Sequence, residues 1–216
     1  MRSQFDRRIV SESTLAFVRA VQRRVRIHLG GGSALGGAWL GHRLSRDIDL
    51  ICHAPEDVRN AIQALNEAAS DCKGTVTLVR DAGTFVRARA LLEGTPLEVD
   101  VTFEGHGDLS APVVLEGVML ESLEDQRASK LTCLLSRTEP RDLVDLLFLD
   151  RAGHPPEGDL ALAVQKDAGI DPAALAWLLS EFPTNPLPQM LEPLTEHELR
   201  QFRDDLRERF RRLAVP

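Results

Sequence analysis

The sequence predicts a mixed α/β domain over residues 1–120, followed by a domain of helices over residues 121–216. Segments in which apolar and polar residues alternate, as they do in strands, recur up to Phe103. After about residue 120, the apolar residues recur instead at helical spacing. A chain of 216 residues is long enough to bury a core and to carry a helical second part.

In the first part we expect helices and strands to alternate. Ser11 or Ser13 suits the cap of the first helix, and Pro55 suits the first position of the third. The expected helices span residues 12–24, 34–42 and 55–69. The expected strands span residues 25–29, 47–51, 75–80, 84–92 and 97–103, and the last two are joined by a turn over residues 93–96.

The second part begins with Ser122 and Asp125, which form a capping-box pattern before an apolar run. We expect the helix that follows to end near residue 137, and Pro140 to open the next. The remaining expected helices span residues 140–151, 159–168, 172–181 and 196–213.

Composition excludes several classes of protein. The net charge of −7 argues against a uniformly basic surface that binds nucleic-acid duplexes. No apolar run approaches the roughly 18 residues of a membrane span, so we expect a cytoplasmic protein. Three widely spaced cysteines fit neither a disulfide framework nor a zinc motif. We expect the scattered histidines, His28, His42 and His53 among them, to be surface or strand residues, and Trp39 and Trp177 to be core anchors.

The most informative segment runs from the glycines at 30–32 to Leu50. Glycines after a strand let backbone N–H groups approach a ligand, and a helix that begins there points further N–H groups at the same place. Asp47 and Asp49 are two residues apart on the next strand, so their side chains share one face. Two carboxylates on one face favour a bound cation, and Mg²⁺ takes oxygen ligands and bridges to phosphates. The segment therefore predicts phosphoryl or nucleotidyl transfer.

A third carboxylate is expected from the strand over residues 97–103. Asp100 lies there among apolar neighbours, where an acid is costly unless it binds something. Glu98 lies on the same face of this strand.

These motifs carry a resemblance. Gly32-Ser33 followed by Asp47-Ile48-Asp49 resembles the signature of the DNA polymerase β-like nucleotidyltransferase superfamily. The longer string, from Gly31-Gly32-Ser33-Ala34-Leu35 to Arg43-Leu44-Ser45-Arg46-Asp47-Ile48-Asp49-Leu50, resembles the AbiEii/AbiGii-type nucleotidyltransferase toxins. There Ser33 stands where the family commonly has Thr. A second block, with Lys130, Arg137 and Arg141-Asp142-Leu143-Val144-Asp145-Leu146, is similar to the helical motif of that family.

The resemblance implies a polymerase-β-like nucleotidyltransferase core with a mixed sheet, followed by a C-terminal helical bundle. It implies that Gly31, Gly32 and Ser33 hold the triphosphate of an NTP, with Arg46 and Arg43 beside it. Asp47, Asp49 and Asp100 would bind Mg²⁺ or Mn²⁺. Alternatively, Asp100 would act as the base that activates the acceptor hydroxyl. Lys130 would contact phosphates. Asp145 would be a functional acid, and Asp142 is the second choice for that role.

The function implied is transfer of a nucleoside monophosphate from an NTP to RNA, at the 3′ end of tRNA, by a toxin that a cognate antitoxin counters. Three alternatives stay open: a small-molecule acceptor such as an aminoglycoside, a protein acceptor, and a catalytically inactive nucleotide-binding partner protein. An RNA acceptor on an acidic protein requires a local basic cluster, for which Arg43, Arg46, Lys130, Arg137 and Arg141 are candidates. The arginines of residues 200–212 are a further candidate patch.

Overall fold

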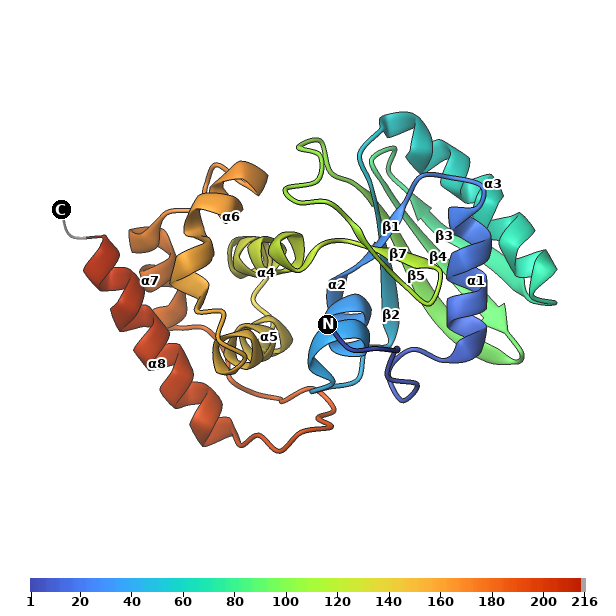
Figure 1. The fold of residues 1–216 in the computed structure, drawn as a ribbon. Helices are drawn as coiled ribbons and strands as arrows, with labels where there is room; N and C mark the ends of the chain where they lie inside the picture. The colour runs from blue at the N-terminus through green and yellow to red at the C-terminus, as the bar shows by residue number, and fades with distance from the viewer. Residues whose placement is uncertain (215–216) are drawn as a thin grey trace. The chain divides into compact units, whose positions relative to one another are not determined.

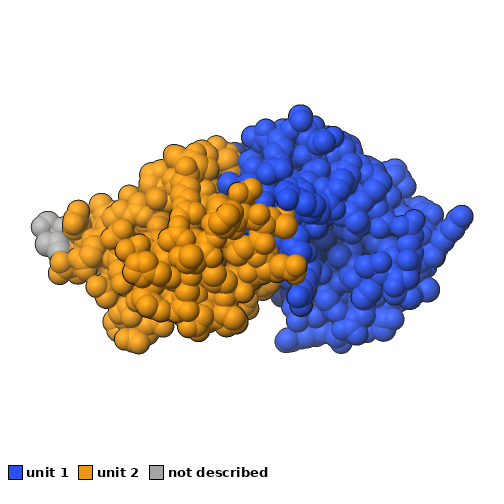
Figure 2. Space-filling model, turned by 90° about the horizontal axis from the view of Figure 1, so that it is seen from below, with its two compact units in different colours: residues 1–122 blue, residues 123–216 orange. Residues whose placement is uncertain are grey.

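The computed structural model describes residues 1–214 of the chain. The chain divides into two compact units, residues 1–122 and residues 123–216, which Figure 2 draws in blue and orange.

Unit 1 contains one mixed sheet of seven strands, in the order β3-β4-β5-β2-β1-β7-β6 (Figure 1). Two neighbouring pairs, β2 with β5 and β1 with β7, are parallel, and the other four are antiparallel. The strands are β1 (His28–Gly30), β2 (Asp47–Cys52), β3 (Thr75–Asp81), β4 (Phe85–Leu92), β5 (Thr95–Phe103), β6 (Val113–Leu115) and β7 (Val118–Leu120).

One face of the sheet is apolar and covered. Helices α1 (Glu12–Gln22) and α3 (Pro55–Asp71) pack against each other, and α3 packs on strands β2 to β5 (Figure 1). Every second residue of the central strands points into this layer, and the buried set includes Ile48, Leu50, Ala88, Val99 and Val101. The polar residues between them are therefore left on the opposite face.

The connection from β1 to β2 differs in detail from the prediction. The strand expected over residues 25–29 spans only residues 28–30, and helix begins at once with α2 (Gly31–Ala34). It continues as a single π-helical segment, Leu35–Leu40, which ends at Gly41 in the left-handed conformation (φ 72°). His42, expected at the surface or in a strand, is fully buried in the loop that follows.

A β-hairpin formed by β6 and β7 was not predicted. Its two-residue turn, Glu116-Gly117, has positive φ at both positions (48° and 75°), as the favoured hairpin turns require. The same Glu-Gly pair at residues 93–94 turns β4 into β5, and there the turn was predicted. The strands of the missed hairpin are only three residues each, too short for a period to be recognised.

Unit 2 is made of helices only, within the residues that the structure describes. They are α4 (Leu123–Ser136), α5 (Pro140–Arg151), a 3₁₀ turn (Pro156–Asp159), α6 (Leu160–Lys166), α7 (Pro172–Ser180) and α8 (Glu196–Leu213). The bounds of α5 and α8 are those predicted. Leu199, Leu206 and Phe210 form the buried side of α8, which packs mainly on α7.

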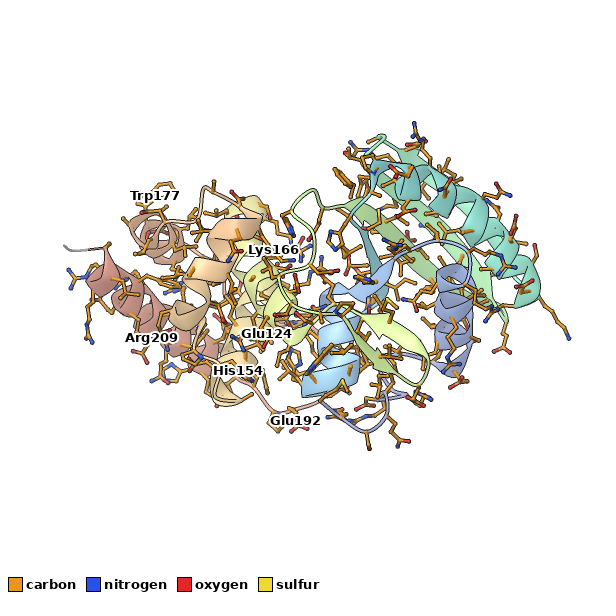
Figure 3. All side chains as sticks on the ribbon, turned by 45° about the horizontal axis from the view of Figure 1, so that its top comes forward. Glu124, His154, Lys166, Trp177, Glu192 and Arg209 are labelled. Carbon is orange, nitrogen blue, oxygen red and sulfur yellow. The ribbon has the colours of Figure 1, made fainter. Side chains whose placement is uncertain are left out.

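The expectation that both tryptophans anchor the core is wrong for Trp177, which is 74% exposed (Figure 3). Helix α7 buries Leu175 and Leu179, which are four residues apart. Trp177 lies two residues from each, about 200° around the helix, and so it faces away from that core. Trp39 is half-buried.

No helix among residues 1–214 is long and apolar enough to cross a membrane.

Helix α8 begins with a complete capping box, in which Thr195 and Glu198 each bond to the backbone of the other. We predict that Thr195→Ala lowers the free energy of unfolding of unit 2 by about 1 kcal/mol, because an N-cap acceptor is lost. Thr195→Ser keeps the hydroxyl and should stay near the wild type in urea unfolding. Equal losses in both variants would contradict the capping role.

Candidate active site

The glycine turn after β1 lies directly against the carboxylates of β2. Gly31 has a φ of +61°, and a methyl group built there would overlap the carboxylate of Asp49. A methyl group at Gly32 would lie 2.8 Å from Nη2 of Arg43 and 2.9 Å from Oγ of Ser45. Glycine is therefore required at this turn for two reasons, the backbone conformation and the close approach of β2.

The register of β2 and β5 gathers the acids that the sequence singled out. Asp47 pairs with Glu98 and Asp49 pairs with Asp100 in the parallel ladder. Paired residues of neighbouring strands share a face, so the four carboxylates form one group, which we call the carboxylate face. It is the face opposite the apolar layer that α3 covers.

Two arginines of β4 extend the carboxylate face. Arg87 binds Asp100 through two hydrogen bonds of 2.8 and 2.7 Å, and Arg89 binds Glu98 at 2.6 Å. The hydrogen bonds to Asp100 raise the pKa of Arg87, so the guanidinium stays charged. The side chain of Asp100 is 13% exposed and that of Arg87 is 49% exposed, so this pair borders solvent.

The other candidate residues of unit 1 differ in accessibility. Asp47 accepts a hydrogen bond of 2.9 Å from Ser45, which orients its carboxylate. Arg46 is exposed, whereas Arg43 is buried and donates to the backbone oxygen of Leu44 at 3.1 Å. Ser33 is 1% exposed, and its hydroxyl lacks a hydrogen-bond partner within the described residues. A buried hydroxyl beside the glycine turn suits a ligand that supplies the missing partner.

The carboxylate face offers ligands of the kind that a hard divalent cation takes. Oxygen ligands on one face are what Mg²⁺ requires, and a guanidinium already provides a positive charge for Asp100. Asp47 and Asp49 would hold such an ion, and Asp100 lies beside Asp49 to share it.

Unit 2 brings the residues of the second motif together in a buried cluster. The ammonium of Lys130 lies 2.7 Å from Asp145 and 3.2 Å from Asp142, and Arg137 holds Asp142 through two hydrogen bonds. Lys130, Asp142 and Asp145 are at most 3% exposed. Burial by itself raises the pKa of Asp142, but Lys130 and Arg137 outweigh it and hold that pKa below its ordinary value.

A family model described as nucleotidyl transferase AbiEii toxin of type IV toxin–antitoxin systems matches residues 16–216. The chain belongs to this family. It is therefore a nucleotidyltransferase, and the type IV system to which the AbiEii family belongs implies a cognate antitoxin. Nucleotidyltransferases of this kind generally use an NTP and a divalent metal ion. No curated protein matches the sequence.

Solved structures share the fold of this AbiEii family member. JHP933 from Helicobacter pylori and a putative nucleotidyltransferase from H. pylori each have a TM-score of 0.60 at 19% identity. The first match covers 95% of this chain and 94% of that one, and the second covers 94% and 93%. MenT4, a nucleotidyltransferase toxin from Mycobacterium tuberculosis H37Rv, has a TM-score of 0.54 at 15% identity, over 94% of this chain and 87% of its own.

Three residues near the candidate site were not found from the sequence: Arg87, Ser45 in its role beside Asp47, and Glu121. Glu121 is 2% exposed, and its carboxylate lies where a side chain on Gly30 would be. The partner of Asp100 could have been found, because the turn at residues 93–94 pairs Leu92 with Thr95 and hence Arg87 with Asp100. Glu121 gives no comparable signal, since it follows the strand of the hairpin that was missed.

We predict that Gly31→Ala lowers the stability of unit 1 and abolishes nucleotidyl transfer, because the methyl group displaces Asp49. Gly94→Ala is the matched control, since its φ is +80° but no atom lies within 4 Å of the added methyl. It should cost only the backbone strain of about 1–2 kcal/mol and keep full activity. Urea unfolding and a transfer assay compare the two, and equal activity in both would contradict the close approach to Asp49.

The buried cluster makes the stability of unit 2 depend on pH. We predict that Asp142→Asn lowers the free energy of unfolding by about 3 kcal/mol at pH 7, since buried cations lose a charged partner. Because the folded pKa of Asp142 lies below its ordinary value of 3.8, the difference from wild type is complete above that pH and shrinks as the pH falls below it. Urea unfolding as a function of pH measures this difference.

Asp150→Asn is the control on the same helix. Asp150 pairs with Arg209, and its side chain is 30% exposed, so its loss should cost under about 1 kcal/mol. If Asp150→Asn lowered the free energy of unfolding as much as Asp142→Asn does, the buried cluster would not be more important for stability than a partly exposed ion pair.

Proposed function

We propose that this AbiEii family toxin is a Mg²⁺-dependent enzyme that transfers a nucleoside monophosphate from an NTP to RNA, at the 3′ end of tRNA. This modification would stop growth until the cognate antitoxin counteracts the toxin. Because its substrates are NTP and tRNA, we place its action in the cytoplasm.

The carboxylate face beside the glycine turn is the observation that carries this proposal. Asp47 and Asp49 share a face with Asp100, and Gly31 lies against Asp49. A cradle for phosphates next to grouped carboxylates is what phosphoryl chemistry needs. A family member that had lost catalysis would have no use for a group of carboxylates that repel one another.

Each candidate residue has a role in this proposal. The backbone of Gly31 and Gly32 and the hydroxyl of Ser33 bind the triphosphate, with Arg46 alongside. Asp47 and Asp49 would ligate Mg²⁺. Asp100 would either share this ion or act as the base. In unit 2, the second motif of the family supplies Lys130 as the candidate phosphate-binding cation and Asp145, its partner at 2.7 Å, as the candidate functional acid.

The reaction forms one bond and breaks one. The oxygen of the acceptor hydroxyl attacks the α-phosphorus of the NTP, the bond to the bridging oxygen of pyrophosphate breaks, and pyrophosphate leaves. A carboxylate, for which Asp100 is the candidate, accepts the proton of the hydroxyl. The bound metal ion would neutralise charge on the phosphates while this happens. The glycine turn and Ser33 would orient the triphosphate for this reaction.

The basic cluster expected to bind RNA is largely engaged within the fold. Arg43 and Lys130 are buried, while Arg137 and Arg141 form ion pairs with Asp142 and Glu139.

Exposed arginines of unit 1 offer a candidate surface for an RNA acceptor, although two of them also form ion pairs, Arg87 with Asp100 and Arg89 with Glu98. Arg80 on β3 pairs in register with Arg87 on β4, and both side chains are exposed. Together with Arg89 they line the strands next to the carboxylate face. Phosphate contacts from such side chains would give binding that weakens steeply with salt.

The test of the acceptor is incubation of the purified protein with total RNA, an aminoglycoside or bulk protein, each with one labelled NTP and Mg²⁺. We expect label in the tRNA fraction, at the 3′ end, and a decrease as salt rises. Label in the aminoglycoside or the protein instead would overturn the RNA acceptor. No label in any of them, with Mg²⁺ or Mn²⁺, would overturn the proposal for these acceptors.

We predict that Asp49→Asn lowers the rate of transfer by about 10³-fold or more while the protein stays folded, because a charged ligand is lost at the reacting phosphates. Glu98→Gln is the matched control on the same face. Glu98 lies beside Asp47 in the ladder, but its side chain is 39% exposed and its carboxylate is paired with Arg89, so the rate of this variant should stay near that of the wild type. Activity of Asp49→Asn close to that of the control would refute the assignment.

A further inference from the structure

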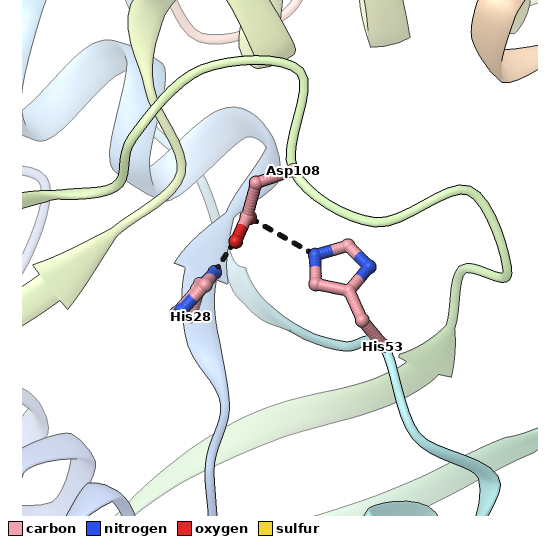
Figure 4. A group of neighbouring side chains, drawn as sticks. All are labelled: His28, His53 and Asp108. Carbon is pink, nitrogen blue, oxygen red and sulfur yellow. Dashed lines mark hydrogen bonds and ion pairs between the residues drawn. The ribbon is translucent and has the colours of Figure 1, made fainter.

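Two histidines and an aspartate of unit 1 converge at one point (Figure 4). His28 lies on β1, His53 follows β2, and Asp108 lies in the loop between β5 and β6. Nδ1 of His28 and Nε2 of His53 are each 3.1 Å from the same oxygen, Oδ1 of Asp108. The three ligand atoms all lie within 4.8 Å of one another, and the two rings meet edge to face at 5.8 Å.

The protonation of His53 follows from its second contact. Its Nδ1 lies 2.9 Å from the backbone oxygen of Glu104, which can only accept a hydrogen bond, so Nδ1 carries a proton. In the neutral imidazole, Nε2 then presents a lone pair to the carboxylate of Asp108. Two electron-rich atoms at 3.1 Å repel unless a cation, a proton or a metal ion, lies with them.

This arrangement is typical of metal-binding histidines. Such a histidine commonly donates its other ring N–H to a backbone carbonyl, which fixes the tautomer and the orientation of the ring. Glu104 does this for His53. Ligands about 2.0–2.1 Å from a tetrahedral ion lie roughly 3.3 Å apart, close to the 3.1 Å separations here.

The site has room for a ligand besides the protein side chains. The three residues line a cavity of about 390 Å³ whose wall also includes Asp57 and Arg26. His28 is buried, and the side chains of His53 and Asp108 are 19% and 28% exposed, so the cavity is reached from solvent.

The cluster is separate from the carboxylate face. Asp47 and Asp49 lie at the first half of β2, whereas His53 follows its last residue, Cys52. Asp49 and His53 are four positions apart along the chain, about 13 Å of extended backbone.

We propose that His28, His53 and Asp108 bind one divalent transition-metal ion of the Zn²⁺ class, with a further coordination position left to water. Two imidazoles and one carboxylate select such an ion over Mg²⁺, which prefers oxygen ligands only. The ion ties the loop of residues 104–112 to β1 and β2, and so it supports the sheet that carries the carboxylate face.

The test uses the full chain, stripped with a chelator, to which Zn²⁺ is added. We expect one Zn²⁺ per chain by titration calorimetry and by elemental analysis after gel filtration. Zn²⁺ should raise the melting temperature of unit 1, whereas Mg²⁺ at the same concentration should not do so through this site. Co²⁺ in its place should give the visible absorption of a four-coordinate ion.

Asp108→Asn and His53→Gln should weaken Zn²⁺ binding by roughly 100-fold or more, since the loss of outer-shell partners alone costs 10–100-fold. Circular dichroism checks that both variants fold. His197→Gln, on the exposed part of α8, should bind like the wild type, and so should Asp49→Asn, which removes a carboxylate of the other site.

Absence of Zn²⁺ binding by the wild type would overturn the proposal. Unchanged binding in Asp108→Asn and His53→Gln would also overturn it, as would loss of binding in Asp49→Asn instead. Because the readout is metal content, failure here leaves the transfer of nucleotides to RNA unaffected.

Discussion

The parallel pairing of β2 with β5 is the constraint on which the candidate active site depends. It sets Asp49 beside Asp100, although carboxylates side by side repel each other. The register is fixed by the opposite face, where Ile48, Leu50 and Val99 are buried against the helices. A slip by one residue would move this apolar set into the place of the acids. Burial of the core therefore holds the carboxylates together and provides the free energy that opposes their repulsion.

Strand β4, which neighbours β5, supplies positive charges that offset those of the carboxylates. The two-residue turn between β4 and β5 places Arg87 opposite Asp100 and Arg89 opposite Glu98. Arg87 borders solvent, so its pair with Asp100 contributes little to stability and can be exchanged for another cation at small cost. Lys130 is the contrasting case, because it is buried between two carboxylates. Removing one partner there leaves a charge without compensation in a medium that solvates it poorly.

Much of this could be predicted from the sequence, because the signals were local. Period-two alternation located β2 and β5, and with them the face shared by Asp47 and Asp49 and the face shared by Glu98 and Asp100, while helical spacing and Pro140 gave the bounds of α5. The pairing of the two strands, which sets Asp100 beside Asp49, is non-local and was not predicted. The features that were not predicted depend on contacts between distant residues or lie in segments too short to show a period. The three-residue strands of the β6–β7 hairpin carry no period, and Trp177 is exposed because the core of α7 lies on its other side. The histidines gave no signal, since His28, His53 and Asp108 come together only through the sheet and the loop after β5.

The two cation sites proposed for unit 1 differ in the chemistry of their ligands. The carboxylate face offers oxygen atoms only and borders the glycine turn, which suits an ion that keeps waters and binds phosphates. The other cluster offers two imidazole nitrogens, one of them oriented by a backbone carbonyl, and these suit an ion that binds nitrogen firmly. Because the ligand types differ, each ion has a site that the other fits poorly. The two ligand sets lie toward opposite ends of β2. β2 thus carries grouped carboxylates near one end, and the loop that we propose to be linked to it by a metal ion lies near its other end.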